Sequence, residues 1–481
     1  MEKHPLAGLE PKAPLAFFEE ICAIPHGSRH TKQISDYLVR FARDRGLRCI
    51  QDESNNVMIF QPGTPGYEDH PPVILQGHMD MVCEKDPGCS IDFERDGLAL
   101  THDGENIYAE GTTLGGDDGI AVAYALALLD SKEIPHPPLE VLITVDEEIG
   151  MLGAAALDAS PLKGRTMINL DSEDEGILTV SCAGGATATL ELRAERKAVY
   201  GPCLELTVEG LTGGHSGVEI DKNRANANKV LGDFLSRVQE KIPLCLTSLS
   251  GGSKDNAIPR SASAKVVAMA LDLKPVEEIA AALQAEVRAS FAEPNAVVRV
   301  DEVEALGGNA FGTQDTRRAV GLLCAVPNGV QAMSQDIPGL VQTSLNLGIA
   351  RLEGESMSLT FSVRSSNNQE KRALLERLEK TAATFDGTYS EMGEYPAWEY
   401  RKDSPLRERM VAVYRQMFGA EPQVVAIHAG LECGLLGDKL PGLDCVSFGP
   451  QMMDIHTSRE KLNIASTERM WKYLLEILKG L

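Results

Sequence analysis

The chain has 481 residues, and its 70 acidic and 46 basic side chains give a formal net charge of −24. Because nucleic acid and anionic membranes bind basic surfaces, this charge balance argues against either one as the main partner. The composition, 43% hydrophobic and 24% charged, is that of a globular protein, and the length predicts two or more domains.

The ten cysteines are scattered without a C-x-x-C pair, so neither a zinc ribbon nor a dense disulfide framework is expected. The N-terminal sequence, MEKHPLAGLEPKAPLAFFEE, has proline and acids where a signal peptide needs an apolar stretch. The longest fully apolar run, 120–129, has about ten residues, whereas a membrane-spanning helix needs roughly 20. We therefore expect a cytoplasmic protein with reduced thiols.

Residues 1–186 alternate helical patterns with short apolar strands. Helices are expected at 12–23, 31–45 and 119–130, and strands at 73–76, 139–145 and 167–170. This alternation predicts βαβ units and a largely parallel sheet.

From residue 187 the pattern changes, because TATLELRAERKAVYGPCLELTVEGL alternates apolar and polar residues as a half-exposed antiparallel sheet does. Helices are expected at 226–240, 276–290 and 368–384, with strands at 262–272, 295–304 and 355–364. Near residue 400 the first pattern returns, with helices at 403–418 and 466–479 and strands at 423–427 and 443–448. We predict an α/β domain formed by 1–186 and 396–481, interrupted by an inserted α+β domain at 187–395.

Reactive side chains follow several predicted strands of the outer domain. They are His78 and Asp80 after 73–76, Asp146, Glu147 and Glu148 after 139–145, Asp171 after 167–170, and His456 after 443–448. A further pair, Asp117 and Asp118, stands behind two glycines where the helix 119–130 begins. Since ligands of an open α/β sheet bind beyond the carboxyl ends of its strands, these side chains are expected to converge.

Taken singly, each motif has a plainer interpretation: a surface histidine, a helix cap or a solvated acidic loop. Taken together, the histidines and carboxylates form a ligand set that suits zinc, and a carboxylate can bridge two metal ions about 3.5–4 Å apart. A phosphate loop is disfavoured because GTTLGGDDG lacks the Lys-[ST] ending and its acids would repel phosphate. No G-x-S-x-G motif indicates a serine hydrolase.

With these residues identified, the chain resembles the co-catalytic di-zinc exopeptidases that include aminoacylases and glutamate carboxypeptidases. Within that family it looks most like the aminoacyl-histidine dipeptidases. The resemblance follows nearly the whole chain in order, through LQGHMDMV, GTTLGGDDGI, TVDEEIGMLGA, NLDSEDEG, CAGG, GGHSG, DNAIPR, SVRSS and HAGLECG. Each motif alone is weak, but the ordered set is specific.

The resemblance implies a role for each residue at the strand ends. The first zinc would be bound by His78 and Asp171, the second by Glu148 and His456, and both by Asp117. Asp80 would orient His78, and Glu147 would be the general base. His428 also follows an apolar run and competes for the last ligand position, but the Asp-Ile-His-Thr sequence near the chain end favours His456. The sequence does not decide the role of Asp118, where many members of the family have a different residue.

The segment 187–395 resembles the lid domain that mediates dimerisation in related enzymes. There His215 corresponds to a histidine that reaches the active site of the neighbouring subunit and polarises the scissile carbonyl. Asn256 and Arg364 correspond to substrate-binding residues, and a guanidinium suits a free α-carboxylate. Gly430 would offer a backbone N–H group to the same carboxylate, although a tight turn explains it nearly as well.

The reaction implied is hydrolysis of dipeptides with a free C-terminal carboxylate, Xaa-His dipeptides among them, by a homodimer that needs no nucleic acid or membrane. Two Zn²⁺ ions per chain, with Mn²⁺ or Co²⁺ as possible substitutes, would bind a bridging water whose proton Glu147 accepts. An N-acyl amino acid hydrolase or a tripeptidase of the same family remains an alternative. A further alternative is a catalytically inactive protein that binds peptide or metal.

Overall fold

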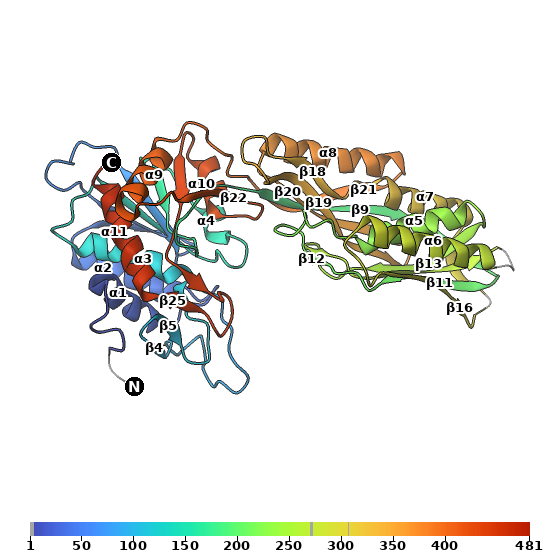
Figure 1. The fold of residues 1–481 in the computed structure, drawn as a ribbon, viewed down its shortest axis with the longest axis horizontal. Coiled ribbons are helices and arrows are strands. Elements are labelled where there is room, and N and C mark those ends of the chain that lie inside the picture. Colours follow the sequence, from blue (N-terminus) through green and yellow to red (C-terminus); the bar gives the residue numbers. More distant parts are fainter. Residues whose placement is uncertain (1–3, 270–272, 306) are drawn as a thin grey trace. The chain divides into compact units, whose positions relative to one another are not determined.

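The computed structural model describes residues 4–269, 273–305 and 307–481, which form two compact units. Unit 1 consists of Met1–Ser181, Tyr400–Ala426 and Leu431–Leu481, and unit 2 of Cys182–Glu399 and Ile427–Gly430. Figure 1 shows both as ribbons coloured along the sequence. The predicted insertion, 187–395, falls within the continuous part of unit 2. The short segment 427–430 also groups with unit 2, which the sequence did not indicate.

Unit 1 contains an eight-stranded sheet in the order β1-β2-β6-β3-β7-β23-β8-β22. Its strands are β1 (Arg48–Gln51), β2 (Val57–Gln61), β3 (Val73–His78), β6 (Leu139–Thr144), β7 (Thr166–Asn169), β8 (Ile177–Cys182), β22 (Gln423–Ile427) and β23 (Asp444–Ser447). The four strands β6, β3, β7 and β23 pair in parallel, whereas β1, β2 and β8 pair with their neighbours in antiparallel fashion. The predicted parallel sheet is therefore confirmed at the centre, and the sheet as a whole is mixed.

The central strands are apolar because both faces of the sheet are covered. Every residue of β3 and of β6 is buried, as expected for parallel strands with helices on both sides. The helices of unit 1 are α1 (Lys12–Cys22), α2 (Lys32–Asp44), α3 (Gly116–Asp130), α4 (Leu152–Ala156), α9 (Pro405–Phe418), α10 (Glu432–Lys439) and α11 (Ile464–Leu478). Residues 116–129 of α3 are all buried, which explains its alanine- and leucine-rich sequence.

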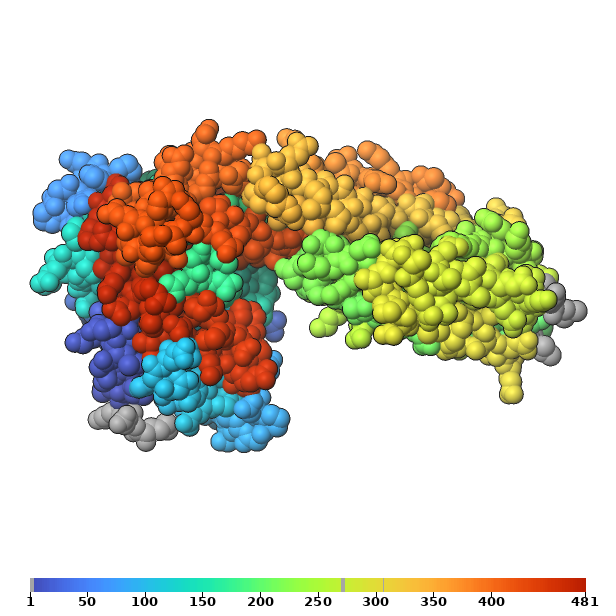
Figure 2. All heavy atoms as spheres, viewed as in Figure 1, coloured from blue at the N-terminus to red at the C-terminus, as the bar shows by residue number. Residues whose placement is uncertain are grey.

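A smaller sheet of unit 1 brings the end of the chain beside its first quarter. It has the order β24-β25-β5-β4, with β24 (Met452–Met453), β25 (Lys461–Asn463), β5 (Asn106–Ala109) and β4 (Leu100–His102). Red C-terminal and blue-to-cyan N-terminal atoms accordingly share the surface of unit 1 (Figure 2). The loop between β24 and β25 contains His456.

Unit 2 is built on an antiparallel nine-stranded sheet in the order β16-β11-β15-β13-β19-β20-β9-β21, with β18 paired to β19. Its strands are β9 (Gly184–Arg193), β11 (Cys203–Glu209), β13 (Leu244–Gly251), β15 (Ala262–Ala268), β16 (Val297–Val303), β18 (Gly329–Met333), β19 (Val341–Glu353), β20 (Ser356–Ser365) and β21 (Thr388–Tyr395). Two two-stranded sheets complete the unit: β10 (Arg196–Val199) pairs with β17 (Gly308–Phe311), and β12 (Gly214–His215) pairs with β14 (Ala257–Ile258). Residues 270–272 of the predicted strand 262–272 lie outside the described residues.

The helices of unit 2 are α5 (Ala227–Gln239), α6 (Lys274–Ser290), α7 (Thr313–Ala325) and α8 (Asn368–Thr384). They pack with apolar residues of the sheet, such as Leu206 and Phe361, in one continuous core (Figure 1). Helix α7 was not predicted from the sequence. Among the described residues of both units, none of the helices is long and apolar enough to cross a membrane.

Candidate metal centre

The parallel centre of the unit 1 sheet brings the predicted ligands together. Strand β3 ends at His78, which pairs in register with Thr144 at the end of β6. On the other side of β3, Gln76 pairs with Asn169 at the end of β7. The acids that follow β6 and β7 therefore leave the same edge of the sheet as His78.

The Asp117 carboxylate lies between two histidines. Its Oδ1 atom is 3.1 Å from Nε2 of His78, and its Oδ2 atom is 3.1 Å from Nε2 of His456. Asp117 is 7% exposed and His78 is 1% exposed, so both groups are held away from bulk water. The two oxygens of this carboxylate face two different imidazoles. A ligand that bridges two metal ions needs this arrangement.

Two further carboxylates complete the set, one beside each histidine. Oε1 of Glu148 is 2.9 Å from Nε2 of His456, and Oδ1 of Asp171 is 3.8 Å from Nε2 of His78. Within the described residues, ligand atoms of His78, Asp117 and Glu148 lie within 4.8 Å of one another, and so do those of His78, Asp118 and Asp171. Imidazole nitrogens and carboxylate oxygens at this spacing fit divalent transition-metal ions, and they fit two ions better than one.

Burial and neighbouring charges shift the pKa values of the two histidines and of Asp171. Burial alone would lower the pKa of His78, but its hydrogen bonds with Asp117 and Asp80 raise that pKa well above the usual value. Hydrogen bonds with Asp117 and Glu148 raise the pKa of His456 to about 10. Burial raises the pKa of Asp171, with the Asp118 and Asp117 charges adding to the effect. Cations would stabilise the same carboxylates and displace these protons.

Asp80 makes contacts that the sequence did not predict. His78 donates through Nδ1 to the backbone carbonyl of Asp80 at 2.9 Å, while the Asp80 carboxylate is 3.5 Å from that nitrogen. A proton on Nδ1 leaves Nε2 free to bind metal. The carboxylate itself accepts the Ser28 hydroxyl at 2.8 Å and the backbone N–H of Glu147 at 3.1 Å. Asp80 thus contacts both His78 and the turn after β6.

Glu147 is half-buried on that turn, between Asp146 and the predicted ligand Glu148. Asp146 has a positive φ of 55°, and its carboxylate accepts the backbone N–H of Arg29 at 2.6 Å, which fixes the turn from the opposite side. Burial is the main cause that raises the pKa of Glu147 to about 8; the Glu432 and Glu148 charges act in the same direction, and His78 opposes them. A carboxyl group with this pKa is suited to proton transfer near neutrality.

Asp118 is fully buried beside the ligands. Its Oδ2 atom accepts the backbone N–H of His78 at 3.2 Å, and its Oδ1 atom has no hydrogen-bond partner among the described residues. Burial raises its pKa well above the usual value. Asp118 thus supports the backbone of His78 and adds an acid to the cluster that His78 and Asp171 form, a position that the sequence left open.

Two buried acids near the ligands were missed in the sequence. Glu432 is fully buried and accepts hydrogen bonds from Gln76 Nε2 and Thr144 Oγ1, both at 2.6 Å. Glu460 accepts four backbone N–H groups next to Asp117. Neither residue follows an apolar strand, and the only signal available was that Glu432 lies within the HAGLECG motif.

In unit 2, His215 pairs with Ala257, so it lies beside Asn256 on a two-strand ribbon. Nδ1 of His215 accepts the backbone N–H groups of Gly217 and Val218 at 3.1 and 3.3 Å. Burial lowers the pKa of His215, and the Arg364 charge lowers it further, so the ring is neutral. With Nδ1 accepting, the proton is on Nε2, where it can be donated to a substrate oxygen.

Arg364 and His428 form a second group in unit 2. Arg364 pairs in register with Ser344, whose hydroxyl lies 2.7 Å from Nε2 of His428. Burial lowers the pKa of His428 to about 4, and Arg364 contributes, so this imidazole is neutral. His428 belongs to unit 2, whereas the predicted metal ligands belong to unit 1. The segment 427–430 also contains Gly430, and the backbone N–H of Ala183 donates to the carbonyl of Ala429 at 3.0 Å.

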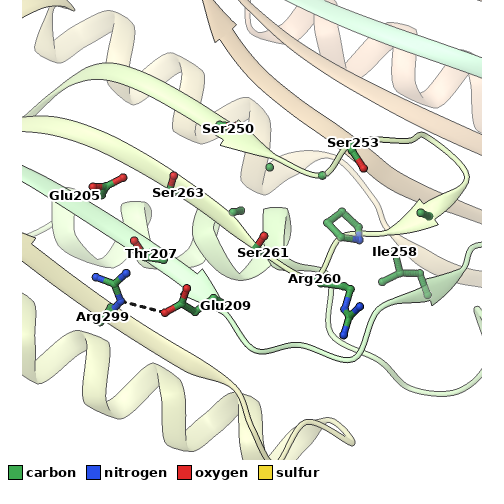
Figure 3. A pocket seen from close by; sticks show the side chains of 15 residues that line it. Glu205, Thr207, Glu209, Ser250, Ser253, Ile258, Arg260, Ser261, Ser263 and Arg299 are labelled. Carbon is green, nitrogen blue, oxygen red and sulfur yellow. Dashed lines mark hydrogen bonds and ion pairs between the residues drawn. The ribbon is translucent and has the colours of Figure 1, made fainter.

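A cavity of about 580 Å³ lies elsewhere in unit 2, on the sheet around the hairpin that follows β13 (Figure 3). Its walls include the hydroxyl groups of Ser250, Ser261 and Ser263, and an ion pair between Arg299 and Glu209 at 3.2 Å. None of the predicted site residues lines it. Its lining mixes these polar groups with apolar side chains such as Ile258 and Pro259, and it is separate from the predicted metal ligands.

Comparisons with known proteins agree with this geometry. Residues 74–480 match the family described as peptidase family M20/M25/M40. The chain is 36% identical over 478 residues to the cytosol non-specific dipeptidase of Escherichia coli, covering 98% of each protein. It is also similar to the crystal structure of aminoacylhistidine dipeptidase from Vibrio alginolyticus, with a TM-score of 0.94, 37% identity, and coverage of 99% of this chain and 98% of the other. Aminopeptidase PepT from Bacillus cereus shares the fold, with a TM-score of 0.56, 16% identity and 98% coverage of both chains.

Proposed function

The chain belongs to the peptidase family M20/M25/M40, and from this membership we propose that it hydrolyses dipeptides with a free C-terminal carboxylate, Xaa-His dipeptides among them. It is a metallopeptidase of the dipeptidase type. The names of the relatives from Escherichia coli and Vibrio alginolyticus, each matched along nearly its whole length, support this activity. The name of the Escherichia coli relative, a cytosol dipeptidase, also supports a cytoplasmic location. The observation that supports it most directly is the Asp117 carboxylate between His78 and His456.

We propose two Zn²⁺ ions per chain. His78 and Asp171 would hold the first, Glu148 and His456 the second, and Asp117 both. This proposal is supported by the mixture of nitrogen and carboxylate ligands, although Mn²⁺ or Co²⁺ could take the same positions. When bound, such a pair of ions lowers the pKa of a coordinated water towards neutrality and stabilises negative charge on a substrate oxygen.

Glu147 is the proposed general base. It would accept the proton of the attacking water and then donate it to the leaving amine. Two features support this role: its backbone N–H is fixed by Asp80 at 3.1 Å, and its pKa is raised to about 8. Cations next to it would lower that pKa, so that the carboxylate is free to accept a proton at neutral pH.

Residues of unit 2 are the proposed substrate contacts. Arg364 would bind the substrate carboxylate, assisted by Asn256 and the backbone of Gly430, which restricts the enzyme to short peptides. His215 would donate from Nε2 to the scissile carbonyl oxygen of the neighbouring subunit in a homodimer. The neutral state of His215 and the acceptor role of its Nδ1 atom support this assignment.

A substrate panel tests the proposal. Chelator-stripped protein with Zn²⁺, Mn²⁺ or Co²⁺ added back should hydrolyse β-Ala-His and Gly-His, and should hydrolyse N-acetyl amino acids and tripeptides much more slowly. Preference for N-acetyl amino acids or tripeptides would assign the chain to another activity of the family. Metal-bound protein with no hydrolysis across the panel would leave only a binding function.

A further inference from the structure

Glu460 is a buried carboxylate that contacts neither histidine of the metal centre. It is 3% exposed and lies in the loop before β25, four residues after His456. Its Oε2 atom accepts the backbone N–H groups of Leu114 and Gly115 at 2.8 and 3.2 Å. Its Oε1 atom accepts those of Gly116 and Asp117 at 2.8 and 3.4 Å. One side chain therefore satisfies four consecutive backbone donors.

The segment 114–117 needs such a partner because of its local conformation. Gly115 is in the left-handed region with a φ of 66°, and Asp117 has non-helical dihedral angles although it is within α3. Consecutive N–H groups on a turn of this kind point towards one point and form an anion-binding concavity. Buried backbone donors without a partner are costly, and bonds to an ionised acceptor are stronger than neutral ones. The Glu460 carboxylate meets both requirements.

The same two segments also meet through the ligands. Oδ2 of Asp117 is 3.1 Å from Nε2 of His456, while the backbone N–H of Asp117 faces Glu460. Between these two contacts the chain makes a turn, in which the N–H of Glu460 donates to the carbonyl of Thr457 at 3.1 Å. Two contacts therefore join the segments 114–117 and 456–460. One is between the predicted ligands Asp117 and His456, and the other is between the Glu460 carboxylate and the backbone of 114–117.

We infer that Glu460 is a positioning residue for the second metal ion, holding the bridging Asp117 and the His456 loop at the distance that this ion requires. The first site contains His78, the last residue of β3, and Asp171, which follows β7, so both are fixed by the sheet. The second site depends on His456, whose loop lacks that support. Loss of the Glu460 carboxylate should therefore weaken the second site selectively. This inference rests on the proposed two-metal function.

The test is metal binding by Glu460→Gln, measured by Co²⁺ absorption titration of metal-free protein and by zinc retained after dialysis against a chelator. Glutamine keeps the size of the side chain but places an NH₂ group against backbone N–H groups. The expected result is a loss of affinity for one of two ions by about 10–100-fold, the range seen when partners of metal ligands are removed. Excess metal should restore the activity of the variant, and thermal unfolding of its metal-free form should show that it is folded.

Glu140→Gln is the matched control. Glu140 is 5% exposed in the same unit and also accepts backbone N–H groups, from Lys163 and Gly164 at 2.9 Å, at the opposite end of β6 from Glu147. Its loss should lower stability without changing affinity for either ion. If Glu460→Gln behaves like Glu140→Gln, or weakens both sites equally, the inference is wrong.

Gly116→Ala provides a second variant if Glu460→Gln does not fold. A Cβ atom at Gly116 would lie 3.2 Å from Oε1 of Glu460 and 3.2 Å from Sδ of Met452, so both side chains would have to move by a few tenths of an ångström. A smaller loss of affinity for the same ion is expected, and unchanged affinity would contradict the inference. The number of ions bound by the unmutated protein is measured first. If that protein binds one ion or none, the proposed two-metal function is wrong. If it binds two ions and Glu460→Gln binds both with unchanged affinity, only the role of Glu460 is wrong.

Discussion

The backbone N–H of Glu147 donates to the Asp80 carboxylate at 3.1 Å, and the backbone carbonyl of Asp80 accepts the Nδ1 proton of His78. The residue proposed to move the proton is therefore linked through one aspartate to a residue proposed to hold metal. Ser28 donates to the same carboxylate from an N-terminal loop. Because Asp80 has several partners, the Glu147 turn and the His78 ring are fixed relative to each other.

Glu147→Gln should separate chemistry from metal binding. Glutamine keeps the backbone hydrogen bond to Asp80 but cannot accept the proton of the water. Turnover of Gly-His should fall by about 10²–10⁴-fold, the usual contribution of a general base. Metal content should stay at two ions per chain, measured by elemental analysis. Parental turnover in this variant would rule out Glu147 as the base.

Arg364→Gln should act on the carboxyl end of the substrate. Losing a hydrogen bond to a charged group costs about 1.5–3 kcal/mol, so kcat/KM for dipeptides should fall by about 10–100-fold, mainly through KM. A dipeptide amide, which has no C-terminal carboxylate, is the control substrate. The parent and the variant should hydrolyse that amide at similar low rates. An equal loss on both substrates would show that Arg364 does not bind the carboxylate.

Mixed dimers test the proposed role of His215. His215→Ala and Glu147→Ala homodimers should each be inactive. In a heterodimer, one active site would combine an intact Glu147 with an intact His215 of the other chain, so activity should return for one site in two. The measurement is turnover by isolated heterodimers carrying two different affinity tags. Absence of recovery in verified heterodimers would place His215 in its own subunit's site or outside the reaction.

The metal-free protein should become less stable as pH rises from about 6.5 to 8. Burial raises the pKa of Glu147 to about 8 and of Glu432 to about 7, and hydrogen bonds raise that of His456 to about 10. In this range the folded chain holds protons that the unfolded chain has released from its carboxylates and histidines. Stability therefore falls as pH rises through the folded-state pKa values. Above pH 8 the effect is partly offset, since burial lowers the pKa of Lys229 to about 8.

The measurement is the Tm of the metal-free and metal-loaded protein across this pH range. Metal ions replace the bound protons and favour the ionised carboxylates, so the loaded protein should show little of this slope. A metal-free Tm that is flat or rises between pH 6.5 and 8 would show that these groups are not protonated in the folded chain.

Much of the site could be predicted because strand ends are visible in a sequence. The strands before His78, Glu147 and Asp171 are apolar on both faces, so they end abruptly where the polar residues begin. Their parallel pairing then places the following residues at one edge of the sheet. The same expectation included His456, after the predicted strand 443–448, and Asp117, at a helix start, and the structure places Nε2 of His456 3.1 Å from Oδ2 of Asp117.

The remainder depends on contacts between distant segments. Glu460 looks like one more loop acid until 114–117 is placed against it, and Glu432 looks solvated until α10 places it under β3 and β6. The antiparallel strands β1 and β2, at one side of the sheet, were missed because they are short and partly exposed. The grouping of 427–430 with unit 2 was also missed, since a short segment joins a unit through tertiary contacts alone.

Dipeptide hydrolysis is proposed to require two metal ions at the cluster formed by His78, Asp117, Glu148, Asp171 and His456. This requirement is tested most directly by adding Zn²⁺ stepwise to chelator-stripped protein while measuring hydrolysis of Gly-His. We expect no activity without metal, full activity at two equivalents per chain, and no recovery at any equivalent in Asp117→Asn. Hydrolysis by the stripped protein, or full activity in Asp117→Asn, would contradict it.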